Sequence, residues 1–226
     1  FISNMSNVTL VIPAKNEPES LPKVLDELKS FKVNKLIVMS KDDIKTLEAI
    51  KVYEENILFQ SGKGFGNALR EGINSVTTKY FCVFNADGSF DPKDLEKLEE
   101  KLDNGSDFVF SSRYLKGAGT EDDTILTFIG NFLFTFICNL LFRLKISDVL
   151  YTYVMGSTNL FKSLDMKYDD FSFCVELPIR AKKKNYILAD LPSFERSRIA
   201  GIKKVNEFRD GFLILISILR LLISNK

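Results

Sequence analysis

The stretch Tyr80–Gly88, YFCVFNADG, decides the fold class of this 226-residue chain. Its first five residues are all apolar, which is typical of a strand buried on both faces, and a polar turn with an acidic residue and a glycine follows. Ligands of open α/β sheets bind at the carboxyl ends of the strands, so Asp87 stands where such a site would lie. Taken alone, the pattern equally fits an Asp-Gly turn that only ends a strand.

The same alternation of strand and helix patterns extends over the first two-thirds of the chain. Apolar and β-branched runs predict strands at 8–12, 35–39, 57–60, 80–84 and 107–111. Helical spacing of apolar residues predicts helices at 17–30, 42–55, 66–75 and 92–102. The short connections between them indicate an α/β fold of the Rossmann type, with a mostly parallel sheet flanked by helices.

Composition excludes several classes of function. The chain has no histidine and three cysteines, so His-based hydrolases, His-ligated metal sites and all-thiolate zinc sites are not available to it. A net charge of +1 gives no reason to expect nucleic acid as a partner. Cys82, Cys138 and Cys174 lie in apolar runs, which favours buried thiols in a reducing compartment, and no signal peptide is visible.

Two apolar segments follow residue 119. Residues 124–142 carry no charge and are long enough to suggest a membrane span, but four polar residues recur at four-residue spacing: Thr127, Asn131, Thr135 and Asn139. This stripe favours a helix that packs or lies in an interface. Residues 211–223 predict an interfacial amphipathic helix or, equally, a terminal helix packed on the core. Basic residues available to anionic lipid are Lys203, Lys204, Arg209, Arg220 and Lys226.

Three further segments carry polar groups suited to a ligand. The glycine-rich residues 61–67, SGKGFGN, precede a helix containing Arg70 and could offer backbone N–H groups and Lys63 to a diphosphate, or could be a flexible connection. Residues 11–17, VIPAKNE, leave the first strand and could hold a nucleoside or cap a helix. A basic loop near the C-terminus could clamp an anion; it contains Arg196, Arg198, Lys203 and Lys204.

In this order the segments resemble family 2 glycosyltransferases, most closely the dolichyl- and polyprenyl-phosphate sugar transferases. The matching stretches are 11–17, 62–72, 84–94, 111–114, 130–131, 148–153, 173–176, 192–204 and 208–211. The resemblance implies a GT-A fold, a UDP- or GDP-sugar donor, Mg²⁺ or Mn²⁺, and a lipid-phosphate acceptor. It implies a nucleotide-sugar-binding part at 1–123 and an acceptor- and membrane-facing part of the same domain at 124–226, peripherally attached to the cytoplasmic membrane face. A homo-oligomer is left open.

The resemblance also assigns roles to individual residues. The implied donor-binding residues are Pro13, Ala14, Asn16, Glu17, Asp42, Gly62, Lys63, Arg70, Asn85 and Ala86. The implied metal ligands are Asp87 and Ser89, and the implied catalytic residues are Asp87, Arg113 and Arg198. The implied acceptor-binding residues are Ser112, Asn131 and Lys204.

The chain departs from the family pattern at three places. Asn85 replaces the first acidic residue of the metal motif, residues 39–43 (MSKDD) replace an aspartate-rich strand end, and Thr127 replaces an arginine. A non-catalytic subunit of this fold and a soluble enzyme acting on a hydroxyl acceptor are therefore alternatives. A hydroxyl acceptor would need a carboxylate base, with Asp148 or Glu176 as candidates. A nucleotidyltransferase is disfavoured because residues 13–17 are not a glycine-rich loop.

Overall fold

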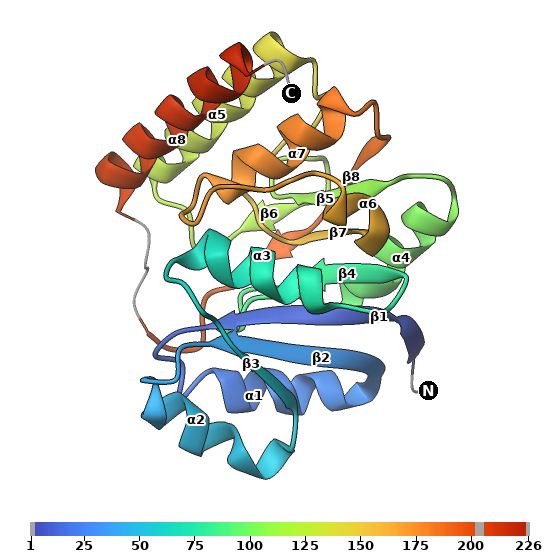
Figure 1. The fold of residues 1–226 in the computed structure, drawn as a ribbon, viewed down its shortest axis with the longest axis vertical. Helices are drawn as coiled ribbons and strands as arrows, with labels where there is room; N and C mark the ends of the chain where they lie inside the picture. Colours follow the sequence, from blue (N-terminus) through green and yellow to red (C-terminus); the bar gives the residue numbers. More distant parts are fainter. Residues whose placement is uncertain (1–2, 202–205, 225–226) are drawn as a thin grey trace.

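The computed structural model describes residues 3–201 and 206–224 (Figure 1). These residues form a seven-stranded sheet in the order β3-β2-β1-β4-β7-β5-β8 and a two-stranded sheet of β6 and β9. The strands are β1 (Ser3–Ala14), β2 (Phe31–Met39), β3 (Asn56–Phe59), β4 (Tyr80–Val83), β5 (Phe108–Ser112), β6 (Gly119–Thr120), β7 (Val154–Ser157), β8 (Leu188–Pro192) and β9 (Phe194–Glu195). Only β7 of the large sheet runs antiparallel to its neighbours, β4 and β5, so the mostly parallel sheet is confirmed.

Helices cover both faces of the large sheet. They are α1 (Leu21–Glu27), α2 (Ile44–Ile50), α3 (Phe65–Ser75), α4 (Leu95–Asp103), α5 (Ile125–Phe142), α6 (Thr158–Lys162), α7 (Phe173–Lys183) and α8 (Glu207–Ile223). Short 3₁₀ turns occupy Leu28–Ser30, Lys51–Tyr53 and Pro92–Asp94. Side chains alternate along β1, so Leu10 and Ile12 join a core with α1 and α4, whereas Val11 joins the core under α3, α6 and α7.

The predicted strands and helices of the first two-thirds are confirmed within a few residues. The predicted helices at 17–30 and 42–55 are shorter than expected, because they begin only at Leu21 and Ile44 and each ends in a 3₁₀ turn. The sequence did not predict β7, which inserts between β4 and β5. Its four residues are too few to show a period, and their partners are decided by the folded sheet.

The two apolar helices lie side by side at the end of the molecule opposite α1 and α2 (Figure 1). The polar stripe of α5 faces the protein: Thr135 Oγ1 accepts a hydrogen bond from Val149 N at 3.1 Å, and Asn139 Nδ2 donates to Ile146 O at 2.7 Å. Its apolar side chains are therefore turned outward. Those exposed on α5 are Ile125, Leu126, Phe128, Ile129, Phe132, Leu133, Phe136, Leu140 and Leu141, and those on α8 are Phe208, Phe212, Leu215, Leu219, Leu222 and Ile223.

We call these exposed side chains of α5 and α8 the apolar face. It is the reverse of a soluble amphipathic helix, which turns its apolar stripe to the core. Among the described residues, α5 is also the one helix whose length and mean hydropathy of 2.0 would allow it to cross a membrane. Because its polar groups bond to the body of the protein, the helix is held against that body along one side.

Candidate active site

A cavity of about 890 Å³ opens at the carboxyl ends of the parallel strands. This volume lies within the range of small-molecule sites. Its walls come from the ends of β1 and β4, the glycine-rich segment before α3, the segment 122–123, and the facing sides of α5 and α8. The predicted residues that line it are Pro13, Ala14, Glu17, Gly62, Lys63, Asn85, Ala86, Asp87, Ser89, Arg113, Asn131 and Arg198.

The loop after β4 holds Asp87 in a turn directed into the cavity. Asp87 Oδ1 accepts hydrogen bonds from Ser89 N at 3.0 Å and Ser89 Oγ at 2.7 Å, and Asn85 Nδ2 donates to Ser89 Oγ at 3.4 Å. Gly88 has φ +83°, and a Cβ there would lie 2.4 Å from Ile199 Cδ1. Ile199 N donates to Asp87 O at 2.8 Å, so the loop after β9 packs directly on this turn.

Asp87, Asn85 and Ser89 offer carboxylate, amide and hydroxyl oxygens at one place. The described residues contain no group of three or more acidic, cysteine or histidine side chains that could hold a metal. Such an oxygen set suits Mg²⁺, which takes one or two carboxylates and completes its shell with water and substrate phosphates. The side chains therefore fit a divalent ion that binds together with a diphosphate.

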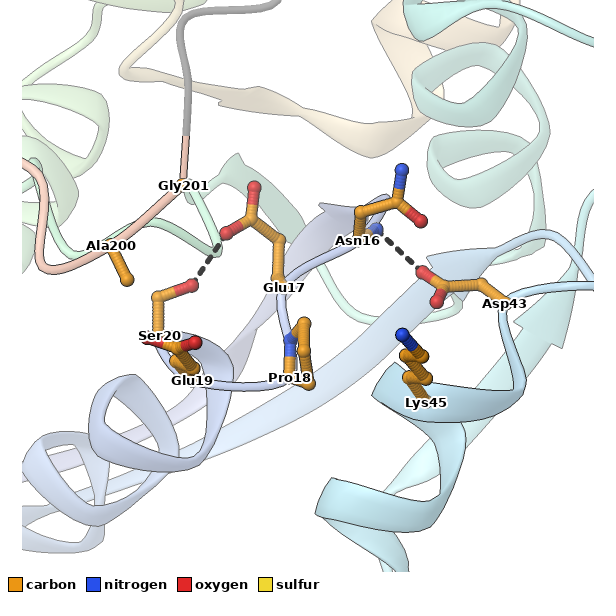
Figure 2. A pocket seen from close by; sticks show the side chains of 9 residues that line it. All are labelled: Asn16, Glu17, Pro18, Glu19, Ser20, Asp43, Lys45, Ala200 and Gly201. Carbon is orange, nitrogen blue, oxygen red and sulfur yellow. Dashed lines mark hydrogen bonds between the residues drawn. The ribbon is translucent and has the colours of Figure 1, made fainter.

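The exit of β1 lies between this cavity and a second pocket of about 280 Å³ (Figure 2). Glu17 lines both, and its carboxylate accepts a hydrogen bond from Ser20 Oγ at 2.5 Å. Asn16 lines only the smaller pocket and has φ +54°, and its backbone N–H donates to Asp43 Oδ2 at 2.6 Å. Asp42, predicted as a donor ligand, lines neither pocket. Asp43, which caps α2, reaches the strand exit in its place.

The glycine-rich segment was predicted to offer its backbone N–H groups to a diphosphate, and three of these groups already have protein partners. Ser61 N and Gly62 N donate to the Glu71 carboxylate at 2.8 and 3.3 Å, and Asn67 N donates to Asp169 O at 3.1 Å. A Cβ on Gly64, which has φ +107°, would lie 2.1 Å from Asp169 O, so the glycine permits this packing. Gly62, Lys63, Gly64 and Phe65 of this segment line the cavity.

Arg70 does not line the cavity, contrary to its predicted donor role. Its guanidinium donates to Lys167 O at 3.1 Å and pairs with Asp169 at 2.6 Å. Arg70 therefore fastens the segment 167–169 to α3.

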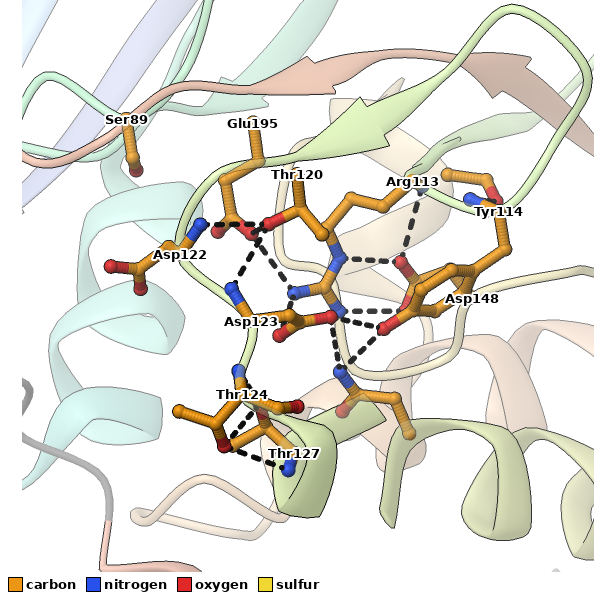
Figure 3. A network of polar contacts seen from close by, with 12 residues as sticks. Ser89, Arg113, Tyr114, Thr120, Asp122, Asp123, Thr124, Thr127, Asp148 and Glu195 are labelled. Carbon is orange, nitrogen blue, oxygen red and sulfur yellow. Dashed lines mark hydrogen bonds and ion pairs between the residues drawn. The ribbon is translucent and has the colours of Figure 1, made fainter. Parts of the chain in front are cut away.

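Arg113 lines another part of the cavity wall and stands at the centre of a buried network of polar contacts (Figure 3). Its guanidinium makes two hydrogen bonds to Asp148, at 2.7 and 3.0 Å, and contacts Glu195 at 3.1 Å and Asp123 at 3.4 Å. The same group lies over the Tyr151 ring, 4.7 Å from its centroid. Arg113 thus lines the cavity, but its donors are directed to three carboxylates, and its role is to hold an acidic wall in place.

The charges in this network shift one another's pKa. Burial acts to lower the pKa of Arg113, but the attraction and hydrogen bonds of Asp148, together with the attraction of Glu195, outweigh it and raise that pKa well above its usual value. Burial raises the pKa of Glu195, against the opposing effect of Arg113. One guanidinium thus faces three carboxylates in this network.

Neither predicted general base reaches the cavity. Asp148 is fully buried behind Arg113. Glu176 is also fully buried; its carboxylate accepts from Lys167 N and Tyr168 N, each at 2.9 Å, and pairs with Arg180 at 2.6 Å. The carboxylates that do line this wall are Asp122, Asp123 and Glu195. The sequence did not predict these three, because acidic residues beside an apolar run (Asp122, Asp123) or within a basic segment (Glu195) are normally solvent-exposed.

The predicted acceptor residues lie in different places. Ser112 is fully buried, its Oγ accepts from Ser147 Oγ at 2.7 Å, and it does not line the cavity. Asn131 does, and its Nδ2 donates to Tyr114 OH at 2.8 Å. Lys204 lies outside the described residues. Arg198 lines the cavity and pairs with Asp122 at 2.6 Å.

Comparison with known proteins identifies relatives along nearly the whole chain. An uncharacterized glycosyltransferase of Mycobacterium tuberculosis is 29% identical over 92% of this chain and 94% of its own length. The glycosyltransferase AglJ of Haloferax volcanii is 25% identical over 94% of this chain and 71% of its own length. A dolichol-phosphate mannosyltransferase of Pyrococcus furiosus is 30% identical, but over 51% of this chain and 35% of its own length.

A solved structure shares the fold. The glucosyl-3-phosphoglycerate synthase of Mycobacterium tuberculosis, crystallised with Mn²⁺, UDP and phosphoglyceric acid, superposes with a TM-score of 0.76 at 14% identity, covering 98% of this chain and 80% of its own. The fold is therefore that of GT-A glycosyltransferases. The model of the family described as Glycosyl transferase family 2 matches residues 9–165. This match covers well over half of the chain, which therefore belongs to glycosyl transferase family 2.

Proposed function

We propose that this enzyme transfers a sugar, with inversion, from a nucleoside-diphosphate donor to a polyprenyl phosphate at the cytoplasmic face of a membrane. The observation that carries the proposal is the course of the cavity. The Asp87 turn lines the cavity, and so do residues of α5 and α8, the two helices that carry the apolar face. One cavity thus offers polar groups for a diphosphate and an exit towards a lipid surface. The free cysteines Cys82, Cys138 and Cys174 fit a reducing compartment.

The donor would lie at the strand ends, with its diphosphate at Asp87. Asp87 and Ser89 would hold Mg²⁺ or Mn²⁺, in keeping with the Mn²⁺ and UDP bound by the fold relative. We expect calorimetric titration with UDP- and GDP-sugars in Mn²⁺ to give saturable heat with one of the two, and much less heat in EDTA. No heat with any donor would instead favour a non-catalytic subunit of this fold.

The chemistry proposed is a displacement at the anomeric carbon. A phosphate oxygen of the acceptor forms a bond to that carbon as the bond to the diphosphate oxygen breaks, and the diphosphate leaves with the electron pair. Lys63 and Arg198 line the cavity and would face the charge that builds on the leaving group. A bound divalent ion would supply further positive charge to the same oxygens. A phosphate acceptor is already ionised near neutral pH, so the reaction needs no general base.

The acceptor would approach from the apolar face. Leu126 and Phe134 of α5 and Phe208 and Ile214 of α8 line the cavity itself, while neighbours on the same helices face outward. Exposed apolar patches of this kind mark sites that bind lipid or protein. Arg209, at the start of α8, lines the same end of the cavity and is exposed, so it could contact a lipid phosphate.

The apolar face provides a direct test of membrane binding. Phe132 and Phe136 are 68% and 54% exposed and do not line the cavity. Burying a Phe side chain is worth about 2 kcal/mol, so we expect Phe132→Ser/Phe136→Ser to weaken binding to phosphatidylglycerol vesicles by roughly 30-fold or more. Vesicle co-sedimentation measures this, and Val52→Ser, which is 82% exposed elsewhere, is the control.

Donor binding should be unchanged in the double variant, because the two side chains lie outside the cavity. Wild-type protein that does not bind vesicles would contradict the membrane proposal. If it then sediments as a dimer that Phe132→Ser/Phe136→Ser dissociates, the apolar face is a contact between two copies.

A hydroxyl acceptor is the second candidate, and one observation favours it. Glu195 lines the cavity with its pKa raised by burial, which brings a carboxyl group closer to the range of a general base. Transfer to soluble sugars but not to polyprenyl phosphate would support this candidate.

A further inference from the structure

The loop after β9 carries Arg198, which lines the cavity. Arg196 N donates to Ser89 O at 2.9 Å and Ile199 N to Asp87 O at 2.8 Å, so the loop lies directly on the proposed metal turn. On its other side, Ser197 N and Oγ donate to Glu121 Oε2 at 3.0 and 3.1 Å. The loop is thus held between the Asp87 turn and the segment that precedes α5.

Arg198 has a specific partner in that segment. Its Nη2 lies 2.6 Å from Asp122 Oδ2 and its Nε 3.3 Å from Asp122 Oδ1, a two-point contact. The next residue, Asp123, turns the opposite way, towards Arg113 (Figure 3). The two adjacent carboxylates therefore pair with different arginines: Asp122 with Arg198, and Asp123 with Arg113.

Both members of this pair line the cavity, and their side chains are only 22% and 23% exposed. Burial lowers the pKa of Arg198, but Asp122, and after it Asp87 and Glu195, outweigh burial and raise it. The arginine thus lies in a negatively charged part of the cavity. A nucleoside diphosphate at Asp87 would bring a stronger anion to the same guanidinium.

We propose that Asp122 is a positioning residue that keeps Arg198 paired at the cavity wall until a nucleoside diphosphate displaces its carboxylate. The inference rests on the proposed donor site. The donor diphosphate must replace the Asp122 carboxylate on Arg198. The ion pair has to break for this, so the donor binds less tightly than it would to an Arg198 without a carboxylate partner. The ion pair also keeps Arg198 beside the diphosphate position, so that little reorganisation is needed once the donor arrives.

Asp122→Asn tests this role. The variant keeps the backbone bond from Asp122 N to Thr120 Oγ1, at 3.1 Å, and removes the charge. We expect Mn²⁺–UDP or Mn²⁺–GDP, whichever binds the wild type, to bind about three- to fivefold more tightly by calorimetry, the range of a partly exposed ion pair. Asp122→Glu should return the affinity towards that of the wild type.

A double-mutant cycle separates this role from general repulsion between Asp122 and the donor. If Asp122 acts through Arg198, Asp122→Asn has no effect in an Arg198→Gln background. If it acts by repulsion, the effect in that background is equal or larger, because Arg198 no longer neutralises the carboxylate. Glu121→Gln is the matched control: it removes a neighbouring charge, keeps an acceptor for Ser197, and should leave the affinity unchanged.

The outcomes are distinguishable from failure of the proposed function. A wild type that binds no nucleotide overturns the donor site and this inference together. A wild type that binds nucleotide, with an affinity that Asp122→Asn leaves unchanged or changes equally without Arg198, overturns the inference alone. Thermal unfolding of each variant confirms that the comparison is between folded proteins.

Discussion

Asp87→Ala is expected to lower kcat/KM for sugar transfer by about 10³-fold, or ~4 kcal/mol of transition-state stabilisation. Asp87 is the carboxylate of the NADGS turn, and its Oδ1 also organises that turn through Ser89. Removing it takes away the charged oxygen proposed to hold the divalent ion and leaves an amide and a hydroxyl. Steady-state assays over a Mn²⁺ series measure the effect.

Two further variants separate charge from loop geometry. Asp87→Asn keeps an acceptor oxygen for Ser89 and loses the charge, so we expect nearly the same loss of activity with an unchanged melting temperature. Asp91→Asn removes a charge four residues away, where the side chain only caps a 3₁₀ turn through Lys93 N, and should leave turnover intact. Full activity of Asp87→Asn would rule out the metal role.

Arg113→Met is expected to lower the free energy of unfolding by about 3–5 kcal/mol, because breaking a buried ion pair leaves uncompensated charge. Asp148, with a fully buried side chain, would lose two hydrogen bonds, and Glu195 and Asp123 would lose their shared cation. Urea unfolding measures the change. Lys29→Met breaks an exposed pair with Asp26 and should leave the free energy of unfolding nearly unchanged.

The deficit of Arg113→Met should depend on pH. Burial already raises the pKa of Glu195, and loss of the guanidinium would raise it further. A carboxyl whose pKa is higher in the folded than in the unfolded protein favours folding below its unfolded pKa, and this advantage is lost as pH rises through the folded pKa. The loss of unfolding free energy in Arg113→Met should therefore be smaller near pH 5 than near pH 7.5. Adding Asp148→Asn, which removes one of the unpaired charges, should partly restore the stability of the variant. A deficit independent of pH would show that Arg113 acts mainly by packing.

The strand and helix order of the first two-thirds could be predicted because each element carries its own signal. Val8–Ile12 and Tyr80–Phe84 are apolar runs that need burial on both faces, and turn residues follow them at the sheet edge. Parallel strands place such turns together, so the sequence alone predicts that Glu17 and Asp87 lie at one site, and both line the cavity. The polar stripe of α5 could also be predicted, because its four-residue spacing lies within a single helix.

What each side chain binds was decided only by the tertiary structure. Arg70, Ser112 and Asp148 have the chemistry of site residues, yet partners 35 or more residues away in the chain hold each of them away from the cavity. Asp122 faces Arg198 because the segment after β9 crosses the segment before α5, 76 residues apart in the chain. Local pattern determines which elements form, because burial and turn chemistry act over a few residues. The pairing of charges depends on which distant segments meet, and that is a property of the folded chain alone.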